Sequence, residues 1–204
     1  MQQIVLLVCG GMHPPSYTEH VLRTIAEDET LSTISRVVYA APSAYGLEIL
    51  SPFALRQGIE ASLAVPAKEG TAPVLVIWAF SAGCVGAMAL AAHWQRHRGP
   101  VLALFMVDGW GVPRDPAVPT YRLSHDYTTH CTSRWLGAGD TDFYADPAVS
   151  HLEFWQQLST ASGWAVGPGK GRQRLSAANF LCQRSREAIA LYQSQRDSLN
   201  INSP

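Results

Sequence analysis

Short apolar runs alternate with amphipathic stretches over the first half of the chain. Among the amphipathic stretches, Thr18–Glu29 and Pro52–Ala64 carry apolar residues at helical spacing. The runs that predict buried strands are Ile4–Cys9, Val37–Ala40, Pro73–Phe80 and Val101–Val107. Such strands, separated by helices and followed by loops rich in glycine or proline, predict a mostly parallel sheet with helices on both faces. We therefore expect an α/β fold, a three-layer α/β/α sandwich.

The second half of the chain has a weaker pattern. Val118–Ser124 predicts one more short strand, which we expect to be the last. The segments after it predict, in order, an irregular stretch, a helix, a loop and a closing amphipathic helix, at Gly137–Pro147, His151–Ser159, Trp164–Arg174 and Leu175–Leu199. If Val118–Ser124 ends the sheet, the chain from Tyr127 onward packs around the core as an appendage.

The composition favours one compact unit. The 204 residues, of which 47% are hydrophobic, are sized for a single domain over residues 1–204. Charged residues make up only 15% of the chain and the formal net charge is −1, which argues against a polyanionic partner such as nucleic acid. Small neutral molecules are the expected partners.

The cysteines and the N-terminus bear on the compartment. Cys9, Cys84, Cys131 and Cys182 show no C-x-x-C spacing, and the first two fall in apolar segments where cysteine acts as a small core residue. We expect no disulfide framework. The chain starts without a basic leader, and no apolar run reaches the ~18 residues of a spanning helix. These features predict a cytoplasmic protein with no membrane span.

One serine lies where the sequence pattern changes from that of a buried strand to that of a helix. Ser81 follows an apolar strand and precedes a helix of small residues, within the motif Ala79–Gly83, of sequence AFSAG. Small residues two positions on either side of the serine let the helix turn back close to its strand, and Gly86 and Ala87 would let the helix lie close to the sheet. The motif resembles the nucleophile elbow of α/β-hydrolase-fold serine hydrolases, with alanine where the family more often has glycine. Alternatively, Ser81 only caps the helix.

The resemblance implies a triad in the chain order serine, acid, histidine. Asp108 lies at the tip of the strand after the elbow unit, where a carboxylate can reach the same crevice. Some lipases that resemble this pattern carry their acid there, although one strand later is commoner. Asp108 could instead only cap its glycine-rich turn. The alternative acids are Asp140, Asp142 and Asp146.

Three histidines lie downstream of these acids. His125 directly follows the predicted last strand, which is where the resemblance implies the catalytic histidine, so we expect it to be the base. His151 begins a predicted helix and is the alternative base. His130 lies five residues from His125, about 140° away on a helix, so the two would not share a face.

The same resemblance implies backbone donors for an oxyanion. The amide after the nucleophile belongs to Ala82, and a second would come from Gly11 or Met12 in the loop after the first strand. A plain glycine turn is the alternative interpretation of that loop.

Other chemistries have weaker support. His125, Asp126, His130 and Cys131 are metal-ligand types, but they lack the spacing that places donors on one face, so we expect no metal and no cofactor. Gly167–Arg172 lacks the Gly-Lys-Ser/Thr of a phosphate loop and is interpreted as a flexible basic loop, able to touch an anionic part of a substrate.

Together these features predict a minimal serine hydrolase that cleaves a small or acyl ester or thioester. The alternative is a catalytically silent protein of the same fold that serves in binding or as a scaffold. A flavodoxin-like binding module would need a phosphate loop after the first strand, and the segment Cys9–Pro15 there has no serine or threonine cluster.

Overall fold

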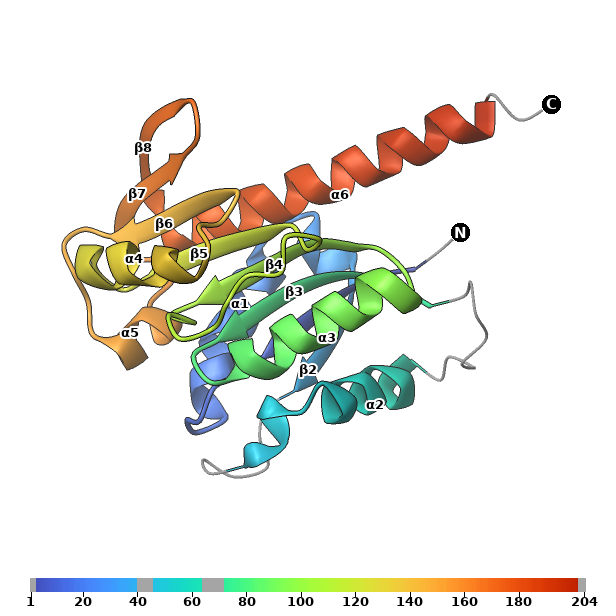
Figure 1. The fold of residues 1–204 in the computed structure, drawn as a ribbon, viewed down its shortest axis with the longest axis horizontal. Helices are drawn as coiled ribbons and strands as arrows, with labels where there is room; N and C mark the ends of the chain where they lie inside the picture. Colours follow the sequence, from blue (N-terminus) through green and yellow to red (C-terminus); the bar gives the residue numbers. More distant parts are fainter. Residues whose placement is uncertain (1–2, 40–45, 64–71, 202–204) are drawn as a thin grey trace.

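The computed structural model describes residues 3–39, 46–63 and 72–201 (Figure 1). The strands are β1 (Ile4–Cys9), β2 (Ser35–Tyr39), β3 (Val74–Phe80), β4 (Val101–Val107), β5 (Thr120–Ser124), β6 (Thr141–Ala145), β7 (Ser162–Gly167) and β8 (Lys170–Ser176). The α-helices are α1 (Ser16–Glu27), α2 (Pro52–Leu63), α3 (Gly83–His97), α4 (Tyr127–Ser133), α5 (His151–Gln156) and α6 (Ala177–Ile201). Short 3-10 helices span Leu31–Thr33, Leu47–Leu50 and Arg134–Leu136.

All eight strands belong to one sheet, in the order β2-β1-β3-β4-β5-β6-β7-β8. The first six strands in sequence pair in parallel, whereas β7 and β8 form an antiparallel hairpin at one side. Because the carboxyl ends of parallel strands meet at one edge, the loops after β1, β3, β4, β5 and β6 lie near one another. The three-layer α/β fold with a mostly parallel sheet is confirmed.

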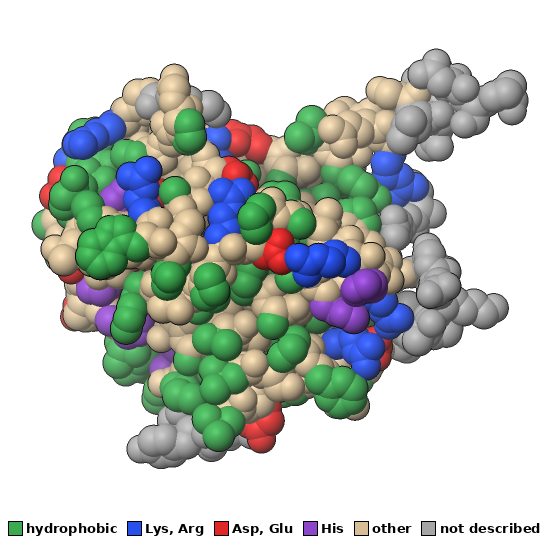
Figure 2. Space-filling model, viewed as in Figure 1, with side chains coloured by type: hydrophobic (Ala, Val, Ile, Leu, Met, Phe, Trp, Pro, Cys, Tyr) green, Lys and Arg blue, Asp and Glu red, His purple; other side chains and the backbone are tan. Residues whose placement is uncertain are grey.

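The sheet separates two hydrophobic cores, one on each face. Alternate residues of the central strands point to opposite faces, as the pleat requires: Trp78 packs with α1, α5 and α6, whereas Ile77 packs with α2 and α3. Every residue of β3 is buried, which explains its unbroken apolar sequence. On the outer face, exposed apolar side chains of α2 and α3 include Phe53 and Val85, and Figure 2 shows a broad apolar area over these helices.

Two glycines of α3 allow close packing. A Cβ atom at Gly83 would lie 2.2 Å from the carbonyl oxygen of Gly10, so the helix can begin this close to the loop after β1 only with glycine there. A Cβ atom at Gly86 would lie 2.2 Å from the carbonyl oxygen of Ile49. The prediction that Gly86 brings the helix close to the sheet is therefore wrong, because its close neighbour is the 3-10 turn before α2.

The predictions for the second half need correction. The strand β5 is not the last, because β6 forms within the stretch that we expected to be irregular. The predicted loop Trp164–Arg174, including Gly167–Arg172, lies almost entirely in the β7–β8 hairpin. The chain from Tyr127 onward therefore contributes three strands to the sheet rather than an appendage.

Three smaller findings complete the fold. Cys9 and Cys84 are buried as predicted, and burial raises the pKa of both thiols. The predicted ends of a strand at Ala40 and of a helix at Ala64 lie outside the described residues. In the described ranges, no helix is both long enough and apolar enough to cross a membrane.

Candidate active site

Ser81 lies at the carboxyl end of β3 in a strained conformation. Its φ angle is 51°, and with Asp108 at 52° it is one of the two described non-glycine residues with positive φ. Such a conformation costs ~1–3 kcal/mol and persists only where surrounding contacts enforce it. Here the N–H of Ser81 donates to the carbonyl of Val107 at 2.8 Å, and its own carbonyl accepts from the N–H of Cys84 at 3.0 Å. The turn directs the side chain toward the strand ends, as a nucleophile elbow does.

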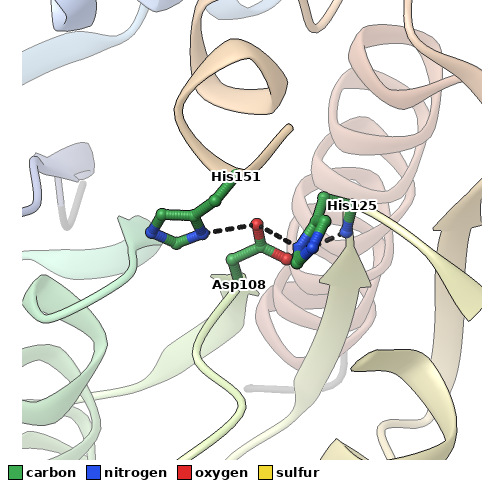
Figure 3. Close-up of side chains that lie close together, drawn as sticks. All are labelled: Asp108, His125 and His151. Atoms are coloured by element: carbon green, nitrogen blue, oxygen red, sulfur yellow. Dashed lines mark hydrogen bonds and ion pairs between the residues drawn. The ribbon is translucent and has the colours of Figure 1, made fainter. Parts of the chain in front are cut away.

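Asp108 lies directly after the neighbouring strand, β4. Hydrogen bonds fix both its backbone and its side chain. Its N–H donates to the carbonyl of Leu123 at 2.8 Å, which ties it to β5. Its side chain is fully buried and accepts three hydrogen bonds (Figure 3). The backbone N–H of His125 donates to Oδ1 at 2.9 Å, and the Nδ1 atoms of His125 and His151 lie 2.9 and 2.8 Å from Oδ2.

His151 connects the serine to this carboxylate. Its Nε2 lies 3.0 Å from Oγ of Ser81, and its Nδ1 faces Oδ2 of Asp108. The carboxylate can only accept, so Nδ1 carries the proton and Nε2 is free to accept from the serine hydroxyl. The three residues therefore form a hydrogen-bonded chain of hydroxyl, imidazole and carboxylate, an arrangement that is chemically able to activate a serine as a nucleophile.

Stacking and a helix cap hold His151 in place. The imidazole stacks on Phe80 with ring centroids 4.9 Å apart, and Phe80 in turn stacks on Trp155 at 5.0 Å. His151 is the first residue of α5, whose N-cap Ser150 forms a capping box with Glu153. The direction of the ring is thus determined by its helix and by the core beneath it.

His125 lies on the opposite side of Asp108 from His151. The centroids of the two imidazoles are 5.9 Å apart, and no hydrogen bond joins His125 to Ser81 among the described residues. The structure therefore places the alternative base, His151, at the position that we expected for His125. The preferred residue was wrong because β6 was not expected: His151 lies after this strand, on a connection that passes over the strand ends, where the N–H of Val149 donates to the carbonyl of His125 at 3.1 Å.

His130 lies away from the serine. It is buried within α4 beside the rings of Tyr127 and Tyr144. Burial, with the positive charges of Arg134 and Arg172, lowers the pKa of His130 to about 4, so the ring is neutral at neutral pH. This histidine packs in the fold and takes no part in the cluster around Asp108.

The alternative acids have partners of their own. Asp140 pairs with Arg114 at 2.5 Å. Asp142 accepts the N–H of Gly139 at 2.8 Å, and Asp146 accepts from Nε1 of Trp164 at 2.8 Å. The structure therefore brings Asp108 to the histidine and leaves these three acids in structural contacts.

The loop after β1 lies directly beside the serine. A Cβ atom at Gly11 would lie 3.1 Å from Cβ of Ser81. The N–H of Gly11, however, donates to Nε2 of His13 at 3.0 Å, so in this conformation it is not free to bind an oxyanion. In the described part of the chain, the amides of Met12 and Ala82 have no such partner. Of the expected donors, these two remain available.

His13 is a site residue that sequence reasoning missed. It is buried, its Nδ1 lies 2.8 Å from the carbonyl of Pro14, and burial lowers its pKa. A neutral ring with its proton on Nδ1 fits both this contact and the bond from Gly11. The sequence around it could have indicated this role. A short loop with two glycines before His13 and two prolines after it offers few backbone acceptors to its own N–H groups, so a side chain is needed to accept from them.

Asp108, His125 and His151 also offer three metal-ligand atoms within 4.8 Å of one another. Of the four metal-ligand residue types considered in the sequence, only His125 belongs to this group, and Asp126, His130 and Cys131 do not. Both Nδ1 atoms face the same carboxylate oxygen at hydrogen-bond distances. A zinc ion about 2.0 Å from each ligand would have to displace both hydrogen bonds, so protons fit this cluster better.

Several apolar side chains lie on the strands, loops and helix that carry the cluster. Trp78 and Phe80 are fully buried and belong to the core, so they do not line an open pocket. Met12, Trp110 and Leu152 are exposed, on the loops after β1 and β4 and next to His151. These three side chains provide apolar surface at the strand ends.

Comparison with models of known protein families gives no match for this chain, and a search among curated proteins finds no relative. The geometry around Ser81 is therefore the basis on which a function can be proposed.

Proposed function

We propose that this protein is a serine hydrolase that cleaves an ester or thioester through an acyl-enzyme. The observation that supports this most is the hydrogen-bonded chain from Ser81 through His151 to Asp108, on a serine with a φ angle of 51°. A serine that only caps a helix needs neither the positive φ nor an imidazole with a buried carboxylate behind it.

The first half-reaction follows from the positions of the atoms. Oγ of Ser81 attacks the carbonyl carbon while Nε2 of His151 takes its proton. The imidazolium keeps its Nδ1 proton on Asp108, whose negative charge stabilises it. The amides of Ala82 and Met12 would donate to the oxyanion, and the N-terminus of α3 adds a favourable dipole.

Collapse of the tetrahedral intermediate completes acylation. The bond to the leaving oxygen or sulfur breaks as Nε2 of His151 returns its proton to the leaving group. Water then attacks the acyl-enzyme with His151 again acting as base, which releases the acid and restores the hydroxyl of Ser81.

The substrate class is proposed from the surface near the serine. Exposed Met12, Trp110 and Leu152 offer apolar contacts to an acyl group or an aromatic leaving group. The low charge content of the chain also favours a neutral small molecule. An ester or thioester is preferred over an amide because its leaving group needs less assistance.

A fluorophosphonate probe tests the proposal. Wild-type protein and Ser159→Ala, which changes an exposed serine elsewhere, should be labelled equally, and Ser81→Ala should not be labelled. Labelling of Ser81→Ala at the wild-type level would refute the role of this serine.

A series of p-nitrophenyl esters of increasing acyl length then measures turnover. We expect hydrolysis that depends on chain length and disappears in Ser81→Ala. Absence of both turnover and labelling would favour a silent binding protein of this fold.

A further inference from the structure

We propose that His125 is a positioning residue for Asp108, and that protonation of His125 switches the triad off at acid pH. The proposal rests on the function proposed above. It goes further because it assigns a role to a histidine that does not contact the serine.

The first step is that His125 makes two hydrogen bonds to the carboxylate of Asp108. Its backbone N–H donates to Oδ1 of Asp108, and its ring Nδ1 donates to Oδ2, each at 2.9 Å. One residue therefore contacts both oxygens, on the side opposite His151. A carboxylate held in this way cannot rotate away from Nδ1 of His151, so His125 fixes the direction of the charge that the base needs.

The second step is the charge that faces the other end of the ring. Nε2 of His125 lies 3.5 Å from a carboxylate oxygen of Asp126. The groups that face this imidazole are thus the carboxylates of Asp108 and Asp126 and the ring of His151. The hydrogen bond to Asp108 is the main cause that raises the pKa of His125, burial opposes it, and the charges of Asp108 and Asp126 add to the rise.

The third step is the effect of a proton on Nε2. Neutral His125 donates to Asp108 and leaves the negative charge of the carboxylate available to His151. When Nε2 gains a proton, the imidazolium of His125 neutralises Asp108 and lies 5.9 Å, ring to ring, from His151. During attack, His151 also becomes positively charged. The charge of Asp108 is then already neutralised by His125, so the imidazolium of His151 is less stabilised and the transition state is higher in free energy. Because the pKa of His125 is raised, activity is present above that pKa and is lost as the pH falls through it.

A pH profile of kcat/KM with p-nitrophenyl butyrate tests this in full-length protein. In wild type, both histidines must be neutral, so the logarithm of kcat/KM should approach a slope of two at low pH. His125→Gln keeps the backbone N–H and offers a side-chain amide donor, but it cannot titrate. We expect its slope to be one. Because the pKa of His125 lies above the ordinary value of about 6.5, the variant should retain at least about fourfold more of its plateau activity at pH 6 than wild type.

Asp126→Asn is the matched control. The asparagine oxygen can still accept the N–H of Thr129 and cap α4, but the charge facing Nε2 is gone. We expect kcat/KM at high pH to stay near the wild-type value. The pH at which kcat/KM falls on the acid side should move part of the way from the wild-type value toward that of His125→Gln. A merely structural role for His125 would lower kcat equally at all pH values and leave the slope unchanged, which would overturn the proposal.

NMR titration of the ring nitrogens gives a readout without turnover. The ring of His125 should take its proton at a higher pH than a free histidine, and at a lower pH in Asp126→Asn than in wild type. If labelling and turnover fail while this titration holds, the hydrolase proposal is refuted but the proton-binding pair is not. If His125 titrates as a free histidine, the switch is refuted whatever the activity.

Discussion

Two segments of the chain, one after β5 and one after β6, each carry a histidine whose Nδ1 faces Oδ2 of Asp108. Each histidine lies beside a capped helix: Asp126 caps α4 just after His125, and Ser150 caps α5 just before His151. Only His151 reaches Ser81. The two segments therefore share their local construction and differ in where the chain goes next.

The difference lies in the route of the connection after β6. Although β6 is farther than β5 from β3 in the sheet, its connection crosses back over the strand ends, where the N–H of Val149 donates to the carbonyl of His125 at 3.1 Å. It then delivers α5 to α1, where Nε1 of Trp155 lies 3.4 Å from the hydroxyl of Thr18. The place in the sheet of the strand before each histidine thus does not decide which one reaches Ser81. The packing of the helix that follows the strand decides it.

Alanine replacements of the two histidines give the largest expected contrast. His151→Ala removes the proposed base and should lower kcat by more than about 10⁴-fold. His125→Ala removes one hydrogen bond to Asp108 and should lower kcat about tenfold. Steady-state hydrolysis of p-nitrophenyl butyrate measures both, with far-UV circular dichroism as the control for folding. A larger loss in His125→Ala would reverse the assignment of the base.

Asp108→Asn tests the carboxylate that the two segments share. The amide would turn a donor toward the N–H groups of the histidines, so His151 loses its charge partner and its preferred tautomer. We expect kcat to fall about 10³- to 10⁴-fold with little change in folding. Asp140→Asn is the matched control, since Asp140 pairs with Arg114 away from the serine. Equal activity of the two variants would contradict the triad.

Phe80→Leu affects one histidine and not the other. The ring of Phe80 stacks on His151, and the structure gives no such contact with His125 among the described residues. Without the stack, His151 should be held less firmly, and we expect kcat to fall about tenfold with KM nearly constant. The NMR titration of His125 should not change. Unaltered kcat in a folded variant would show that the stacking does not position the base.

Removing the two helix caps should have the smallest effect. Ser150→Ala loses the capping box of α5, and Asp126→Ala loses the bond from the N–H of Thr129 that caps α4. Each should lower the free energy of unfolding by about 1 kcal/mol in urea denaturation. Asp126→Asn should keep most of that stability. Only Ser150→Ala should also reduce kcat, because His151 is the first residue of the helix that it caps.

Strong local patterns made half of the site predictable. Ser81 and Asp108 both follow seven-residue apolar strands, whose length and composition indicate a central position in the sheet. The loop of Gly10 and Gly11 was expected beside the serine because it follows β1, a six-residue apolar strand. Where a strand is a long, unbroken apolar run, its end can be located from the sequence.

The histidine that contacts Ser81 was predicted only as the alternative, because β6 has no such pattern. It is five residues long and contains Asp142, which reads as polar but is buried with the N–H of Gly139 as its partner. The hairpin after it was hidden by a glycine-rich turn and by the polar sequence of β8. Burial of a satisfied carboxylate depends on tertiary contacts, so neighbouring residues alone could not reveal this strand or assign His151 to its end.

The polar sequence of β8 also has a consequence for association between molecules. As the outermost strand, β8 has one side that no other strand of the sheet covers, which could template pairing with a further chain. Arg172 and Arg174 are exposed on it, and like charges would meet if two copies aligned there. The β8 strand should therefore resist edge-to-edge aggregation, so the sheet can end in a strand with one open side.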